Sequence, residues 1–446
     1  MGDGNRRNMN KKKKNRRKKK KKMMNAEETF ASKCVWKWAN NNGGLLNSSS
    51  SSSSSSSGED EDFNDVQKSL RVAEPVVFEL HSHSTRSDGF LSPTALVERA
   101  HRSGVKILAL TDHDTMAGIP EALEAARKFG IRIIPGVEIS TMFSPRGNSG
   151  TEEPVHILAY YSSCGPAKFE ELEECLVKIR DGRFRRAKDM LLKLNKLKIP
   201  IKWEHVARIA GNGVAPGRLH VARALVEAGH VENLRQAFSK YLYDGGPAYA
   251  KGNELLVEEA VQLICRTGGV AALAHPWALK NPIPIIRSLK ASGLHAMEVY
   301  RSDGRLAAFS DLADAYELLK LGGSDFHGRG GHDESELGSV NLPVVAVHEF
   351  LTRARPIWCD AIRSILLSFA EEDPNKVSEI SKFKSLKGDM TFENTVLNEG
   401  GDMFTLHLSS WLSNEERKAV EVEAIRLKLS HTVISERGFH ITAVSK

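Results

Sequence analysis

Two histidines separated by one residue follow a short apolar segment in the first third of the chain. His81 and His83 come directly after "PVVFEL" (residues 75–80), and Asp88 lies in the turn-like sequence that follows. Side chains two residues apart on a strand point to the same side, so the two imidazoles could bind one metal ion. Taken alone, such a pair more often consists of ordinary polar residues at a strand end. Other residues of metal-binding type in the chain decide between these interpretations.

Further side chains of this type lie next to predicted strands along the chain. Most of them follow the carboxyl end of a strand, where parallel α/β barrels build their active sites. Imidazole and carboxylate ligands without cysteine favour Mn²⁺, Zn²⁺ or Fe²⁺ over a purely structural zinc site. A set of this size would serve three ions while leaving positions open for water and substrate. The candidate ligands are His81, His83, Asp88, His113, Glu138, His156, His275, Asp325 and His327.

Apolar strands and amphipathic helices alternate from residue 75 to about residue 345, and this alternation must position the ligands. The first helix is expected at residues 92–104, with Ser92 as its N-cap, Pro93 as its first residue and Gly104 as its stop. Alternating strands and helices predict an α/β fold with a parallel sheet, open or closed into a barrel. Residues 167–255 interrupt the alternation with helical patterns and are expected to form a helical insertion over the barrel mouth.

The two ends of the chain differ in composition from residues 73–345. Residues 1–25 carry a net charge of +12, whereas the whole chain carries +7, so the remainder is acidic. The basic run and the serine tract Ser48–Ser57 predict a disordered tail over residues 1–72. Residues 6–22 could contact nucleic acid or act as a nuclear address, or could remain a solvated run without a partner. Residues 346–446 predict a C-terminal helix and an extension of unknown role.

Cysteine usage and hydropathy restrict the expected compartment. The five cysteines are scattered and odd in number, which argues against a disulfide framework and for a reducing environment. No apolar run approaches the roughly 18 residues of a membrane-spanning helix, and no secretory signal is visible. We therefore expect an intracellular protein, cytoplasmic or nuclear, without a membrane partner. The sequence does not predict its oligomeric state.

Six short motifs carry a likeness to a known family. In chain order, "HSHSTRSDG", "TDHD", "GVEIS", "HILAY", "AHP" and "GSDFHG" resemble the PHP family, named for polymerase and histidinol phosphatase. The resemblance covers residues 76 to about 345 and implies a distorted (β/α)7 TIM-like barrel with a trinuclear metal site. Within the family, "GRLHVARALVEAG" and "AFSKYLYDGGPAY" are similar to the bacterial 3′,5′-nucleoside bisphosphate phosphatases, which also act as 5′→3′ exoribonucleases (RNase AM).

The resemblance also implies how the ligands are shared among the ions. The first ion would be held by His81, His83, Glu138 and Asp325, the second by Glu138, His156 and His275, and the third by Asp88, His113 and His327. Glu138 would bridge the first two. Mn²⁺ is the ion expected first, with Zn²⁺ or Fe²⁺ as alternatives. Histidinol phosphatases tend to place a histidine where this chain has Asp88, which favours a nucleotide-directed enzyme.

Clustered divalent ions predict hydrolysis of a phosphate ester by a metal-activated hydroxide. Asp112 and Asp114 flank a ligand and could act as catalytic acid–base groups or could orient that ligand. A second phosphate on the substrate would require cations, and Arg is suited to bidentate phosphate contacts. The substrate-binding candidates are Arg183, Arg186, Arg218 and His220 of the insertion, for which a solvated helix face is the other interpretation.

Three functions therefore remain open at the level of sequence. The first is a metal-dependent phosphoesterase acting on 3′,5′-bisphosphonucleotides or on the 5′ ends of short RNA. The second is a phosphatase of a small metabolite such as histidinol phosphate. The third is a nucleic-acid-binding protein dominated by its basic tail. The complete ligand set argues against a protein that only binds.

Overall fold

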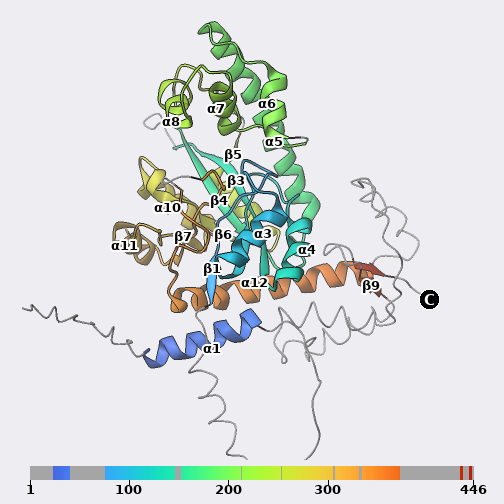
Figure 1. Ribbon diagram of the computed structural model, residues 1–446. Coiled ribbons are helices and arrows are strands. Elements are labelled where there is room, and N and C mark those ends of the chain that lie inside the picture. Colours follow the sequence, from blue (N-terminus) through green and yellow to red (C-terminus); the bar gives the residue numbers. More distant parts are fainter. Residues whose placement is uncertain are drawn as a thin grey trace, which may run out of the picture.

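A computed structural model describes residues 24–40, 76–145 and 152–371, apart from 212, 253, 305–306 and 331–333, together with 432–434 and 441–443. The basic run at residues 6–22, the serine tract and residues 372–431 of the predicted C-terminal extension lie outside the described residues. Figure 1 shows one curled sheet surrounded by helices, with a group of helices beyond one end and the long helix α12 (Val344–Glu371) across the other. Of the helices in the described ranges, none is both long and apolar enough to span a bilayer.

The central sheet has the strand order β1-β2-β3-β4-β6-β7-β8, with the short β5 beside β3. Neighbouring strands are parallel except at β4, which runs antiparallel to both β3 and β6. The strands are β1 (Val77–Glu79), β2 (Val105–Leu110), β3 (Arg132–Phe143), β4 (Glu153–Tyr160), β5 (Leu255–Leu256), β6 (Val270–Leu273), β7 (Ala296–Glu298) and β8 (Leu319–Leu321).

The two edges of the sheet meet just beyond β1 and β8. Ser82 and Phe326 form a parallel bridge there, and the His83 N–H donates to the Phe326 carbonyl at 2.8 Å. The sheet therefore curls round into the predicted TIM-like barrel. The reversed strand β4 is its distortion, because a regular α/β barrel has only parallel strands.

Alternate residues of each strand face two different cores, as the period of two requires. In β2, Ile107 and Ala109 belong to the cluster that fills the barrel, whereas Leu108 and Leu110 belong to the cluster shared with the outer helices. The outer helices are α3 (Pro93–Arg102), α4 (Ile119–Phe129), α9 (Val257–Arg266), α10 (Pro282–Ala291) and α11 (Ala307–Ala315). Helix α3 begins as predicted, with the Ser92 hydroxyl accepting from the Ala95 N–H at 3.2 Å.

Helix α12 closes the end of the barrel from which the strands start. Phe350 and Trp358 are fully buried in the barrel cluster, and the Trp358 indole N–H donates to the Tyr160 carbonyl at 3.0 Å. The domain boundary expected at residue 345 falls at the start of this helix. Because α12 fills the base of the barrel, it is part of the same hydrophobic core as the strands.

Helix α1 (Ala26–Asn40) lies in the segment that the sequence predicts to be disordered. It packs against α12, and Val35 and Trp38 enter the barrel cluster, where Trp38 stacks on Phe78 with ring centroids 6.4 Å apart. The prediction of disorder over residues 1–72 is therefore wrong for residues 26–40. Two local features of this segment indicate a helix, but the polar composition around it outweighed them in the prediction. One is the apolar i, i+3 pair, and the other is a capping box, with the Glu28 N–H donating to Asn25 Oδ1 at 2.7 Å.

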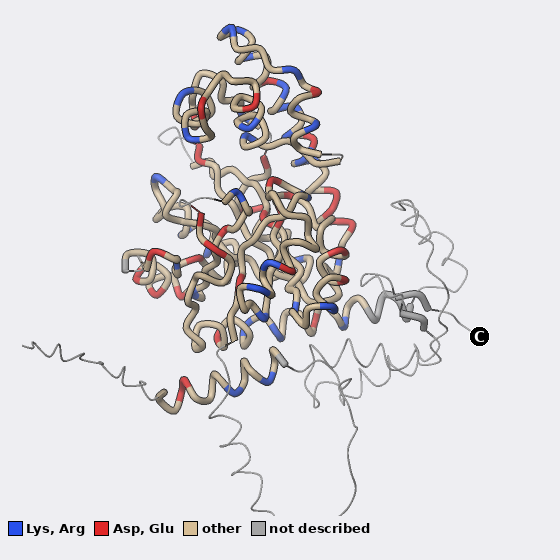
Figure 2. The backbone as a smooth tube through the Cα atoms, in the orientation of Figure 1, with Lys and Arg blue, Asp and Glu red and all other residues tan. Residues whose placement is uncertain are grey.

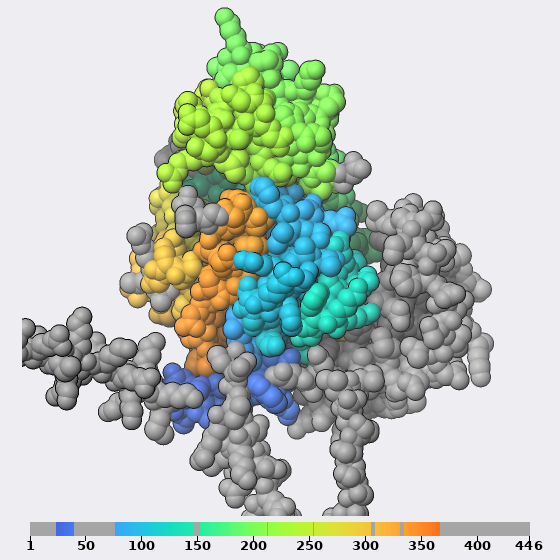
Figure 3. All heavy atoms as spheres, in the orientation of Figure 1, coloured from blue at the N-terminus to red at the C-terminus, as the bar shows by residue number. Residues whose placement is uncertain are grey.

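The segment expected as a helical insertion contains α5 (Phe169–Lys196), α6 (Trp203–Ala210), α7 (Arg218–Glu227), α8 (Leu234–Ala237) and the π-helical turn η1 (Phe238–Leu242). These helices share a small hydrophobic cluster of their own, separate from the two barrel clusters. Figure 3 shows them, in green, stacked over one end of the barrel. That end is the one at which the strand carboxyl ends and the predicted ligands lie.

Candidate metal centre

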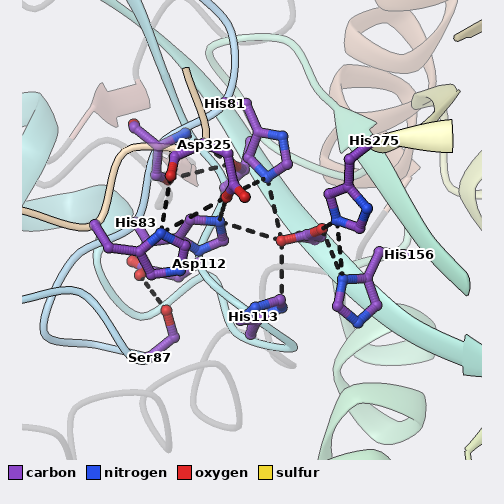
Figure 4. Close-up of polar contacts among 12 residues, drawn as sticks. His81, His83, Ser87, Asp112, His113, His156, His275 and Asp325 are labelled. Atoms are coloured by element: carbon purple, nitrogen blue, oxygen red, sulfur yellow. Dashed lines mark hydrogen bonds and ion pairs between the residues drawn. The ribbon is translucent and has the colours of Figure 1, made fainter. Parts of the chain in front are cut away.

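The nine predicted ligands converge at the carboxyl-end rim of the barrel. His81, His83 and Asp88 follow β1, His113 follows β2, Glu138 lies in β3, His275 follows β6, and Asp325 and His327 follow β8. His156 stands early in β4, and it still reaches the rim because β4 is antiparallel and pairs His156 with Ser140. Figure 4 shows the imidazoles of His81, His113, His156 and His275 pointing toward a common centre.

Asp88 is aimed at this centre by a tight turn after β1. The Gly89 N–H donates to the Ser84 carbonyl at 2.9 Å. A Cβ atom at residue 89 would lie 2.5 Å from the His83 carbonyl oxygen, so only glycine fits there. The turn thereby brings Asp88 Oδ1 to 3.2 Å from His327 Nε2, on the opposite edge of the sheet.

Glu138 occupies the middle of the centre, and its two oxygens face different histidines. Oε2 lies 3.2 Å from both His81 Nε2 and His83 Nε2, and 3.3 Å from His113 Nδ1. Oε1 lies 2.9 Å from His156 Nδ1 and 3.1 Å from His275 Nε2. A carboxylate with separate histidine sets at its two oxygens has the geometry to bridge two cations.

Three groups of side chains are close enough to hold a cation, with ligand atoms within 4.8 Å of one another. The first joins His81, His83, Glu138 and Asp325, which is the predicted first set. The second joins His113, Glu138 and His156, and the third joins His83, Asp88, His113 and His327. His275 completes the second group through Glu138 and through a 3.3 Å approach to His156.

The donor atoms lie close together without satisfying one another's hydrogen-bonding capacity. His83 Nε2, His113 Nδ1 and Asp88 Oδ1 are buried, and each lies within 3.3 Å of a polar atom of another predicted ligand. None of these three atoms makes a hydrogen bond of acceptable geometry within the described part of the chain. Buried polar atoms are normally satisfied, so atoms converging in this way fit a divalent cation between them.

The charges within the cluster depend strongly on one another. Burial would raise the pKa of the Glu138 carboxyl, but the surrounding histidines, led by His113 and His81, hold it well below its usual range. Burial would lower the pKa of His81, but Glu138, Glu298 and Asp325 raise it well above its usual value. The neighbouring carboxylates Asp325 and Glu138 likewise raise the pKa of His83 to about 10, against burial. The ionisation of each histidine is therefore coupled to that of the carboxylates it faces.

The backbone is strained at three positions in the centre. Asp114, His275 and Asp325 adopt positive φ angles of 54°, 28° and 52°. Left-handed backbone is costly for residues with a Cβ atom and persists where surrounding contacts enforce it. Three of the left-handed residues therefore coincide with the cluster of predicted ligands.

The two predicted catalytic carboxylates are already occupied by contacts within the chain. Asp112 accepts from the Ser84 N–H, the Ser84 hydroxyl and the Ser87 hydroxyl, each at 2.7 Å. Asp114 accepts from the Ser140 N–H at 2.7 Å and pairs with Arg183 Nε at 2.5 Å. Of the two roles that the sequence left open, these contacts favour orientation of the ligand loops over proton transfer.

The predicted substrate-binding residues divide into two at the rim and two farther out. Arg183 is buried beside His113, with its guanidinium on Asp114 and on the Ser140 hydroxyl. His220 is buried near Asp88, and burial lowers its pKa to about 4, so its ring is neutral. Its Nδ1 accepts from the Gly217 N–H at 2.9 Å. Arg186 and Arg218 pair within the insertion, with Glu254 and Asp244 respectively.

Three residues of the site were missed by the sequence reasoning. Glu298, in β7, contacts the His81 ring and the His275 backbone. Glu334 accepts from the N–H groups of His327, Gly328 and Gly330 and so shapes the last ligand loop. Arg223, in α7, lies over the Phe90 ring at 4.4 Å and is close enough to Asp88 to affect its own pKa. The one available signal was the carboxylate inside the apolar strand "HAMEVY".

Comparison with known proteins agrees with this geometry. A family model described as "PHP domain" matches residues 79–273. A 5′-3′ exoribonuclease of Haemophilus influenzae is 37% identical over 257 residues, which are 56% of this chain and 89% of that protein. A 3′,5′-nucleoside bisphosphate phosphatase of Chromobacterium violaceum is 34% identical over 297 residues, 65% of this chain and 97% of that protein.

A solved structure is similar over the same region. A metal-dependent phosphoesterase from Bifidobacterium adolescentis superposes with a TM-score of 0.54 at 29% identity, covering 63% of this chain and 97% of that one. The barrel, the ligand cluster and these similarities define a metal-dependent phosphoesterase, a hydrolase. The chain belongs to the PHP domain family.

Proposed function

We propose that this phosphoesterase hydrolyses 3′,5′-bisphosphonucleotides and removes nucleotides from the 5′ ends of short RNA. The observation that carries the proposal is Glu138, a buried carboxylate with separate histidine sets at its two oxygens. Divalent ions in such a site neutralise phosphoryl oxygens and activate water for in-line attack on phosphorus.

The proposed ligand sets for three ions follow the sequence prediction, with additions from the geometry. His81, His83, Glu138 and Asp325 hold the first ion, and Glu138, His156 and His275 hold the second. Asp88, His113 and His327 hold the third, with His83 close by. Mn²⁺ is the ion we expect first, because a mixed imidazole and carboxylate set without thiolates suits it, and Zn²⁺ or Fe²⁺ are the alternatives.

Charge on the insertion supports a substrate with more than one phosphate. Residues 169–242 contain 15 Lys and Arg against nine Asp and Glu, although the chain beyond residue 25 is acidic as a whole. Figure 2 shows these Lys and Arg residues spread over the helices above the barrel. A basic surface beside a metal-lined rim attracts polyanions and raises their association rate.

Within the insertion, α7 presents the groups best placed to contact a second phosphate. His220 and Arg223 both lie near Asp88, and Arg223 makes no ion pair within the described ranges of the chain. Arg183, Arg186 and Arg218 are each held by a carboxylate, so a phosphate would have to compete for them. We therefore add Arg223 to the predicted substrate-binding residues and give it the leading role among them.

The names of the relatives agree with this substrate class. The relatives are named a 5′-3′ exoribonuclease and a 3′,5′-nucleoside bisphosphate phosphatase, and this chain covers 89% and 97% of their respective lengths. The two alignments are 257 and 297 residues long, which is too long to leave out the insertion in the middle of this chain. If the insertion recognises the substrate in these relatives, its presence in this chain favours a nucleotide over a small metabolite as the substrate.

The test is phosphate release from adenosine 3′,5′-bisphosphate by the full chain with Mn²⁺. Asp325→Ala is the metal-site control, and Arg223→Ala is the substrate-site variant. We expect release by the wild type, no release by Asp325→Ala, and a raised KM for Arg223→Ala. Efficient release from histidinol phosphate with none from the bisphosphonucleotide would overturn the proposed substrate class while leaving the phosphoesterase assignment intact.

RNA is tested separately with short 5′-phosphorylated oligonucleotides labelled at the 3′ end. Stepwise shortening from the 5′ end is expected, and it should require the same metal ligands. Early release of the 3′ label on a mononucleotide, without a ladder of labelled intermediates, would contradict the proposed direction.

A further inference from the structure

Glu298 connects two of the proposed metal ligands from the end of β7. Its carboxylate is 1% exposed. Oε1 lies 3.1 Å from His81 Nδ1, and Oε2 accepts the His275 backbone N–H at 2.6 Å. His81 and Glu298 are 217 residues apart in the chain, so only the closed barrel brings them together.

We propose that Glu298 is a positioning residue that prepares His81 and His275 for metal binding. The carboxylate accepts the Nδ1 proton of His81, which leaves the Nε2 lone pair free on the side that faces Glu138 and Asp325. Nε2 lies 3.2 Å from Glu138 Oε2 and 3.4 Å from Asp325 Oδ1. A hydrogen bond at one ring nitrogen fixes which nitrogen can bind a metal. This inference rests on the ligand assignment of the proposed function.

The same carboxylate holds a ligand of the second proposed set. His275 has a φ angle of 28° and a ψ angle of 59°, a conformation that a residue with a Cβ atom rarely adopts. Its N–H is fixed by Glu298, and its ring reaches Glu138 Oε1 at 3.1 Å. One buried carboxylate therefore positions a ligand in each of the two sets that share Glu138.

The geometry makes a specific prediction for Glu298→Gln, which puts an amide in place of the acid. A backbone N–H can only donate, so the single oxygen of the new amide must face the His275 N–H. The NH₂ group of the amide then faces His81 Nδ1 and donates to it. That arrangement moves the ring proton to Nε2, where no metal can bind. Glu298→Gln is thus isosteric but not conservative for the site.

A second buried glutamate, in β1, provides a matched control. Glu79 is fully buried in β1, and its carboxylate accepts from the backbone N–H groups of Ser324 and Gly338, both at 2.9 Å, and of His81 at 3.2 Å. Replacing it by Gln removes a buried charge at similar depth without presenting an NH₂ group to an imidazole. Its main effect should be on stability.

The experiment measures Mn²⁺ binding by calorimetry and thermal unfolding without metal for the full-length wild type, Glu298→Gln and Glu79→Gln. We expect Glu298→Gln to weaken Mn²⁺ binding by about 10- to 100-fold, the usual effect of losing a partner of a metal ligand. Glu79→Gln should lower the melting temperature. Its loss of Mn²⁺ affinity, expressed as a logarithm, should be less than half of the loss in Glu298→Gln. In Zn²⁺-loaded protein with labelled histidines, the wild type should show a hydrogen-bonded Nδ1 proton on His81.

Each outcome separates the inference from the proposed function. A wild type that binds no Mn²⁺ or Zn²⁺ contradicts the proposed ligand sets themselves. A wild type that binds, with Glu298→Gln binding equally well, overturns only the role of Glu298. Equal losses in the two Gln variants would mean that burial of charge, and not ring orientation, is responsible. If Glu298→Gln does not fold, absence of the His81 Nδ1 proton in the loaded wild type overturns the inference by itself.

Discussion

The two ends of the barrel are built in opposite ways. At the base, α1 and α12 bring Trp38, Phe350 and Trp358 against the apolar interior of the strands. At the rim, the corresponding space is filled by six histidines and their carboxylate partners, with left-handed backbone at Asp114, His275 and Asp325. The base is apolar and closely packed, whereas the rim concentrates buried histidines and carboxylates together with three left-handed residues.

This difference shows how the fold can hold a demanding site. Buried charge and left-handed backbone cost free energy, of order 1–3 kcal/mol for each strained residue. Burial of apolar side chains at the base offsets that cost, and these side chains lie at the opposite end of the barrel from the predicted ligands. Substitutions at the two ends should therefore separate activity from stability.

The largest effect is expected at the rim, from Glu138→Gln. Loss of the charge shared by the two histidine sets should lower phosphate release by at least about 1,000-fold, equal to about 4 kcal/mol in the activation barrier. Steady-state kinetics with saturating Mn²⁺ measures this effect. Retention of more than a tenth of the wild-type rate would contradict the central place of Glu138.

At the base, Trp358→Ala should have the opposite profile. The side chain is 1% exposed, so its truncation leaves a cavity and should cost about 4 kcal/mol in the free energy of unfolding. Denaturant unfolding measures the loss, and Mn²⁺ bound per folded molecule should stay unchanged. Leu192→Ala, at a site that is 60% exposed, is the control and should change stability by less than about 0.5 kcal/mol. Loss of metal in the folded Trp358→Ala protein would show that base and rim are not independent.

Arg183→Ala tests the connection between the insertion and the rim. Removal of this cation leaves Asp114 buried and unpaired, which should cost about 3 kcal/mol of stability. The additional change Asp114→Asn should recover part of the loss in a double-mutant cycle. If Arg183→Ala instead raised KM while the unfolding free energy stayed constant, Arg183 would be a phosphate contact, as the sequence suggested.

A smaller effect is expected from α1, where two tryptophans form a matched pair. Trp38→Ala should destabilise the protein by about 2 kcal/mol, because Trp38 is 7% exposed in the barrel cluster. Trp36, two residues earlier, is 45% exposed, and its substitution by Ala should have little effect. Equal melting temperatures for the two variants would mean that α1 does not close the base in solution.

A last effect, similar in size to that of Trp38→Ala, concerns acid stability at the base. Burial, with Arg353 and Lys290 nearby, lowers the pKa of His295 to about 4, and its Nδ1 accepts from the Ala271 N–H at 3.1 Å. Because the folded state favours the neutral ring, this stabilisation is complete above pH 6.5 and is lost as the pH falls toward 4. The expected loss in the free energy of unfolding is about 2 kcal/mol. When this free energy is measured against pH, His295→Gln should flatten the curve between pH 6.5 and 4. If the substitution leaves the pH dependence of stability unchanged, His295 does not contribute to acid sensitivity.

The sequence predicted the barrel and the convergence of nine candidate ligands at its rim because both are encoded locally. Each ligand stands beside a short apolar strand, and the carboxyl ends of parallel strands meet at one rim. His156 was found although its strand is reversed, since its motif is as local as the others. The antiparallel direction of β4 itself was not predictable, because strand direction depends on pairing across the sheet.

Contacts between distant segments explain the remaining differences. Glu298 contacts His81 across 217 residues, and Arg183 reaches Asp114 from a helix of the insertion. Neither pair has a spacing that the sequence could reveal. Helix α1 was missed because composition averaged over residues 1–72 conceals a capping box and two apolar residues that find a partner only in α12.

The most direct test of the account is anomalous diffraction from crystals of the full chain soaked in Mn²⁺. Anomalous peaks are expected at the rim. One should lie between Glu138 and the rings of His81 and His83, and another between Glu138 and the rings of His156 and His275. A rim without anomalous density under conditions in which the enzyme releases phosphate would contradict the proposed metal centre.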